Sequence, residues 1–158
     1  MKNLVLSCLL FASIGFQSCN KKENKDGVVA PKTEADKYVK TECYKAIYEA
    51  DTLDLQLNTL KDGKIIGDLV MKIEFQSEKI GEIRGEFRGD TLFADYTFRQ
   101  GTNKASVFKN PMAFLKRGNE LVLGNGSIVT SLGASYFEKG KPIDFEKVKY
   151  KFTSSECE

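Results

Sequence analysis

The chain has 158 residues, a length that predicts about one domain. Its 24 Lys and Arg residues nearly balance its 22 Asp and Glu residues, so the net charge of +2 gives no sign of the basic face typical of nucleic-acid-binding proteins. The chain contains no His, which excludes imidazole-based catalytic triads, His-ligated zinc and ordinary haem ligation.

Residues 1–18 are predicted to be a signal peptide and not part of the fold. Lys2 supplies a positive start, and Leu4–Phe16 is an uncharged, mostly apolar run of thirteen residues. A helix that spans a bilayer needs roughly twenty such residues. The run is therefore interpreted as the apolar region of an export signal.

Cys19 follows this apolar run directly and precedes a charged tail. The segment Phe16-Gln17-Ser18-Cys19 resembles the lipobox of bacterial lipoproteins, in which the signal is cut before a cysteine that carries a diacylglyceryl thioether. Ser18 fits that pattern, whereas Phe16 and Gln17 depart from the strict consensus, as in relaxed lipoboxes similar to those of Bacteroidota lipoproteins. The resemblance implies that Cys19 is lipidated with acyl chains such as palmitate. It also implies a protein anchored to the outer membrane of a bacterial envelope, since two or more chains give stable anchoring. The alternative is an ordinary secretory signal with a chance cysteine.

Residues 19–42 are predicted to form the lipidated N-terminus and a flexible tether. Asn20–Glu42 contains six Lys and five acidic residues and almost nothing large and apolar before Tyr38. Such a segment buries too little apolar surface to offset the entropy of ordering it. The alternative is a short helix over Glu34–Val39.

From Cys43 onward, apolar residues alternate with polar ones, most strictly in Leu53–Leu57. This period of two places the apolar side chains on one face of a strand. Turns such as Lys61–Lys64 and Arg88–Asp90 separate about eight such segments, which predicts an all-β fold. The expected architecture over residues 43–158 is an antiparallel up-and-down barrel or a barrel-like sandwich.

Large apolar residues at the inward positions are expected to fill most of the barrel interior. A barrel of about eight strands is only wide enough to be filled by side chains or to hold one small ligand. The predicted inward residues are Leu55, Leu69, Met71, Phe87, Tyr96 and Phe98.

Residues 124–147 carry the weakest pattern and are predicted to form a loop, with one short helix around Ser135–Lys139. Within it, Gly124–Gly140 is the preferred contact region, because loops on a rigid scaffold commonly carry recognition. The alternative is a polar loop that merely tolerates insertion.

Cys43 and Cys157 are predicted to form a disulfide. Cys8 is removed with the signal and Cys19 is lipidated in this interpretation, so only these two remain, in a compartment where disulfides persist. The alternatives are two free thiols or a metal site. Two cysteines without histidine make a poor metal site, so no metal and no cofactor is expected.

No catalytic residue is predicted, and the protein is not expected to be an enzyme. Ser106–Lys109 matches the S-x-x-K pattern of penicillin-recognising enzymes, but it lies in an expected strand and the accompanying motifs are absent. Two carboxylate pairs are interpreted as solvent-facing charges: Glu82 with Glu86, and Asp90 with Asp95.

The segment Gly85–Phe98, GEFRGDTLFADYTF, resembles a group of small Bacteroidota lipoproteins, together with Cys43-Tyr44, Asp51–Leu53 and Gly81–Ile83. More distantly, the succession of hairpins is similar to calycin-type up-and-down barrels. The resemblance implies a β-barrel lipoprotein, but it implies no activity, because none is attached to the group.

The sequence therefore predicts a non-catalytic binding or interaction module that takes a protein or a small apolar ligand. The alternative is a purely structural envelope lipoprotein with a filled barrel, and an enzyme is the least favoured class. A cavity would favour ligand binding, whereas a packed interior with an exposed apolar patch would favour the structural class.

Overall fold

The computed structural model describes residues 38–102 and 105–157, and within them the chain is all-β. The ten strands are β1 (Tyr38–Tyr48), β2 (Asp51–Leu60), β3 (Lys64–Lys72), β4 (Lys79–Arg88), β5 (Thr91–Gln100), β6 (Phe108–Arg117), β7 (Glu120–Leu123), β8 (Ile128–Ser131), β9 (Ala134–Phe137) and β10 (Lys151–Ser155). No helix of this part of the chain is long and apolar enough to cross a membrane.

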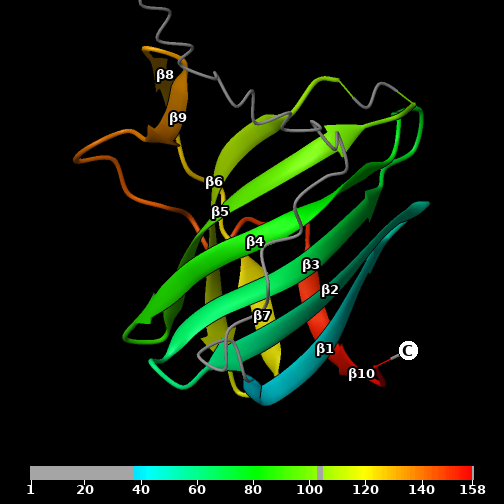
Figure 1. Cartoon of the computed structure of the whole chain (residues 1–158), viewed down its shortest axis with the longest axis vertical. Helices are drawn as coiled ribbons and strands as arrows, with labels where there is room; N and C mark the ends of the chain where they lie inside the picture. The colour runs from blue at the N-terminus through cyan, green and yellow to red at the C-terminus, as the bar shows by residue number, and fades with distance from the viewer. Residues whose placement is uncertain (1–37, 103–104, 158) are drawn as a thin grey trace, which may run out of the picture. The chain divides into compact units, whose positions relative to one another are not determined.

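Eight of these strands close into an antiparallel barrel, which confirms the predicted fold (Figure 1). Strands β1 to β7 each pair with their neighbours in the chain, and β10 fills the remaining place between β7 and β1. Strands β8 and β9 pair only with each other, in a hairpin that is inserted between β7 and β10. The architecture is an up-and-down barrel with one insertion.

The alternating pattern of the sequence becomes the inside and outside of this barrel. Leu55 of β2 lies opposite Leu69 of β3, and Leu53 lies opposite Met71, all four side chains being buried. Tyr96 and Phe98 are buried on β5 as predicted. Phe87, by contrast, is 38% exposed, because it lies near the end of β4, beside the turn at Gly89. The prediction that it belongs to the packed interior was wrong.

Strand β1 begins at Tyr38, inside the segment predicted as a tether. Tyr38–Glu42 pairs with the end of β2, and the Thr41 hydroxyl donates a hydrogen bond to Asn58 Oδ1 at 2.7 Å. The boundary predicted at residue 43 was therefore too late. A short helix reaching Val39 is also excluded, since Val39 lies in β1. The remainder of the predicted tether, the signal peptide and Cys19 lie outside the described residues.

The predicted helix around Ser135–Lys139 is replaced by β9 of the β8–β9 hairpin. Its turn is formed by Leu132 and Gly133, both of which have positive φ angles, 51° and 79°. Positive φ at both central residues is what a two-residue hairpin turn requires, but Asn-Gly is its usual sequence. Because Leu132 occupies the first position in place of asparagine, the sequence pattern did not indicate a turn here.

Cys43 of β1 and Cys157, just after β10, form the predicted disulfide, with their Cα atoms 5.2 Å apart. Cys43 pairs with Ser155 across the β1–β10 ladder, so the bond lies at the place where the barrel closes. The covalent link joins residues separated by 114 positions and ties the first barrel strand to the last.

Candidate functional site

The two ends of the barrel differ in how the strands are connected. At one end, the β2–β3, β4–β5 and β6–β7 connections are tight turns that contain Gly63, Gly89 and Gly118, each with a positive φ. At the other end lie the longer connections: residues 73–78, residues 101–102 and 105–107, and the segment between β7 and β10 that contains the hairpin. We call this second end the mouth.

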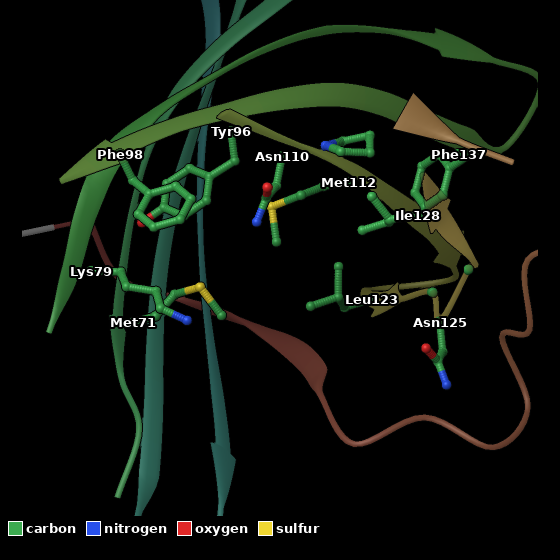
Figure 2. Close-up of a pocket in the computed structure, with 13 residues that line it drawn as sticks. Met71, Lys79, Tyr96, Phe98, Asn110, Met112, Leu123, Asn125, Ile128 and Phe137 are labelled. Atoms are coloured by element: carbon green, nitrogen blue, oxygen red, sulfur yellow. The ribbon is translucent and has the colours of Figure 1, made fainter. Parts of the chain in front are cut away.

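A cavity of about 210 Å³ lies at the mouth, between the barrel and the hairpin. Met71, Tyr96 and Phe98 line one side of it, and Ile128 and Phe137 of the hairpin face them from the other side (Figure 2). Met112 of β6 and Leu123 of β7 complete the apolar lining. The cavity is therefore a pocket bounded by barrel strands and by the hairpin.

The aromatic side of the cavity is held rigidly by stacking and by one buried hydrogen bond. The rings of Tyr96 and Phe98 stack with centroids 4.7 Å apart, and Phe108 stacks on Phe98 at 5.5 Å. The Tyr96 hydroxyl donates a hydrogen bond to the Leu69 carbonyl oxygen at 2.9 Å, and burial raises the pKa of this hydroxyl. The tyrosine therefore remains neutral and its ring stays in place.

The hairpin side depends on two glycines that allow close packing. A Cβ at Gly126 would lie 2.7 Å from the Phe137 ring, and a Cβ at Gly124 would lie 2.5 Å from both Ile143 and Phe145. A hydrogen bond of 2.8 Å from the Glu138 amide to the Ser127 carbonyl closes the base of the hairpin. Glycine at these positions lets the rings approach the backbone and places Phe137 at the cavity.

Three polar side chains line the same cavity: Lys79, Asn110 and Asn125. Lys79 Nζ lies 5.9 Å from the centroid of the Phe98 ring and 3.5 Å from Gln76 Oε1. The side chains of Asn110 and Asn125 form no hydrogen bond with the rest of the described chain. An apolar pocket with a few polar groups of this kind is typical of small-molecule sites.

Elsewhere at the mouth, a buried carboxylate joins three separate segments. Asp51 is 3% exposed and accepts hydrogen bonds from the Glu74 amide at 2.8 Å, the Tyr150 hydroxyl at 2.6 Å and Lys149 Nζ at 2.7 Å. Lys149, with the two other donors, lowers the pKa of Asp51 to about 2, and Asp51 raises the pKa of Lys149 to about 12. Both groups are firmly charged near neutral pH, as expected of a structural ion pair and not of a proton-transfer site. We call Asp51, Lys149 and Tyr150 the rim clamp.

Neither carboxylate pair considered in the sequence meets at one cavity: Glu86 lines a hollow of about 560 Å³ with Asp95, whereas Glu82 lines a different one. Glu82 and Glu86 each bind an arginine two residues further along β4, Arg84 and Arg88. Asp95 binds Lys109 at 2.8 Å on the outer face, so the lysine of the S-x-x-K pattern serves as an ion-pair partner. No group of three acidic or cysteine side chains that could hold a metal ion is present in residues 38–102 and 105–157.

Within the predicted contact region, Gly124–Gly140, Ile128 and Phe137 line this cavity. Met112, Leu123 and Lys79 were not singled out from the sequence. The sequence could have indicated Lys79, because it lies two residues before Gly81 and therefore shares the inward-facing phase of β4. Comparison of the chain with protein families, curated proteins and solved structures finds no match.

Proposed function

We propose that this protein is a non-catalytic binding module, lipid-anchored to a bacterial outer membrane through Cys19, that holds a small ligand at the mouth of its barrel. The observation that carries the binding proposal is the apolar cavity between the inward-facing strands and the hairpin. An engineered apolar cavity of about 150 Å³ binds benzene, so about 210 Å³ has room for a ligand slightly larger than a single ring.

The alternative is a structural barrel with no ligand, and the packed interior beyond the cavity favours it. Leu53, Leu69 and Ile83 are completely buried, and they belong to one continuous cluster with Phe114 and Phe152. The two proposals differ in one respect: only in the binding module does a ligand occupy the cavity that Leu123 lines.

Filling that space is the direct test of binding. Leu123→Trp is expected to lower the affinity for the neutral probe 2-phenylethanol at least tenfold, because the larger side chain occupies the cavity. The affinity is measured by titration followed with NMR chemical shifts. The matched control is Ile80→Trp, since Ile80 is 55% exposed on β4 and absent from the cavity lining. Undiminished binding of the probe by the Leu123 variant would contradict the binding module.

The anchor is tested separately. Cys19→Ser is expected to move the protein from the membrane fraction to the soluble fraction and to remove the acyl mass from the intact protein, because the thioether can no longer form. Cys8→Ser is the matched control, since it lies in the predicted signal, and it should leave both properties unchanged. Retention of the Cys19 variant in the membrane fraction would exclude lipidation as the anchor.

A further inference from the structure

Lys79 occupies an inward position on its strand. It pairs with Met71 across the β3–β4 ladder and with Gln100 across the β4–β5 ladder. Met71 is buried in the interior, and the next residues of the same phase on β4 are Gly81 and Ile83, of which Ile83 is completely buried. Figure 2 shows Lys79 beside Met71 and Phe98 at the wall of the cavity. The strand therefore directs a cation toward an apolar pocket.

This cation lacks a carboxylate partner among the described residues. Its polar contact is Gln76 Oε1 at 3.5 Å, and its ammonium lies near the Phe98 ring. Two outward-facing lysines of the barrel do have carboxylate partners: Lys45 lies 3.1 Å from Asp54, and Lys109 lies 2.8 Å from Asp95. An unpaired cation at the edge of an apolar pocket favours an anion, since the surrounding low dielectric strengthens the attraction.

The rim clamp provides a contrast at the same end of the barrel. Asp51 also belongs to the inward-facing series of its strand, two residues before Leu53, and three donors from the chain itself satisfy it. Nothing comparable neutralises Lys79 within the described chain. The charge of Asp51 is used by the fold, whereas the charge of Lys79 remains available to a ligand.

One neutral donor accompanies this charge. The Asn110 amide lines the cavity between Lys79 and Met112 (Figure 2), has no hydrogen-bond partner in the described chain and offers an N–H to an anionic oxygen, whereas the Asn125 amide lies on the far side and is directed away from Lys79. One ammonium and one amide match the two oxygens of a single carboxylate. A doubly charged group would retain one uncompensated charge beside apolar side chains, which is costly.

We propose that the ligand is a small amphipathic monocarboxylate. Its carboxylate binds Lys79 with the help of the Asn110 amide, and its apolar body lies between Phe98 and Phe137. This inference rests on the proposed function. The cavity of about 210 Å³ is below the roughly 300–1,000 Å³ of pockets that enclose drug-sized ligands, so the apolar body is limited to about one ring or a short acyl chain.

Three probes with the same ring and different head groups test the head-group preference: phenylacetate, 2-phenylethanol and 2-phenylethylamine. The native protein is expected to bind phenylacetate about threefold to tenfold more tightly than the alcohol, as a partly exposed charge pair allows, and to bind the amine most weakly. The preference should decrease as salt is added. Affinities are measured by the same NMR titration at neutral pH.

Lys79→Met keeps the apolar stem of the side chain and removes its charge. The ratio of the affinity for phenylacetate to the affinity for the alcohol is therefore expected to fall to about one, while alcohol binding persists. Lys109→Met makes the same change in net charge on the outer face and should retain the native ratio. Equal binding of acid and alcohol by the native protein, or an unchanged ratio in the Lys79 variant, would overturn this inference and leave the cavity as a neutral site. Binding of none of the probes would overturn the proposed function itself.

Discussion

Replacing Cys43 and Cys157 together with alanine is expected to lower the free energy of unfolding by about 2–5 kcal/mol, the usual cost of removing a native disulfide. The bond joins residues 114 positions apart, and closing a loop of this size restricts the unfolded chain by about 4–5 kcal/mol in the chain-entropy model. The native state keeps its hydrogen-bonded β1–β10 ladder in the variant, so the barrel itself is expected to persist. Urea denaturation of the oxidised native protein and of the double variant measures the difference.

Chemical reduction of the native protein serves as the control for this prediction. Reduction breaks the same bond without changing the sequence, so the urea midpoint of the reduced protein should approach that of the double variant. Equal urea midpoints for the oxidised protein and the variant would mean that the cross-link contributes nothing to stability.

Asp51→Asn is expected to give the largest loss of stability among polar substitutions at the mouth, with a fall in melting temperature of about 5–10 °C. The substitution removes the charge that holds Lys149 and replaces one acceptor oxygen with an amide that cannot accept a hydrogen bond. The β3–β4 connection and the segment just before β10 would then lose their common partner. Asp54→Asn is the matched control, because its side chain is 44% exposed and faces outward toward Lys45.

The rim clamp also predicts how stability depends on pH. An unfolded aspartate titrates near pH 4, whereas the folded pKa of Asp51 is lowered to about 2. The contribution of Asp51 to the stability of the fold is therefore present above about pH 4 and is lost as the pH falls through about 2. The pKa of Lys149 is raised to about 12, so its contribution is complete below its ordinary pKa and is lost as the pH rises through about 12. In Asp51→Asn, the melting temperature should vary less over the acid range than in the native protein. An identical acid profile for the two proteins would contradict this role.

The alternation of apolar and polar residues predicted most of the barrel because it depends only on which face of each strand is buried. Leu53, Leu55 and Leu69 face inward for that reason. The membership of Tyr38–Glu42 in β1 depends instead on pairing with β2, since most of these side chains are exposed and carry no apolar pattern. The exposure of Phe87 depends on where its strand ends.

The candidate site was only partly predictable for the same reason. Its contact region contained Ile128 and Phe137, which the sequence placed in a recognition loop. The space itself lies between the barrel and the hairpin, and Phe137 borders it because Gly126 lets the phenyl ring pack against the backbone; no local pattern encodes that packing. Lys79 could have been found from alternation alone, as a charged residue on an inward phase.

The place of β10 between β7 and β1 has a consequence for how the chain reaches its folded form. Strands β1 to β7 can pair in succession as each follows its neighbour, but the resulting sheet has two open edges until β10 joins both. The hairpin insertion delays that moment, because the chain must continue past β8 and β9 before β10 begins. Contacts between such distant segments form slowly, and unpaired edges can add strands from other chains. The interval before barrel closure is therefore the stage at which this chain is most exposed to aggregation.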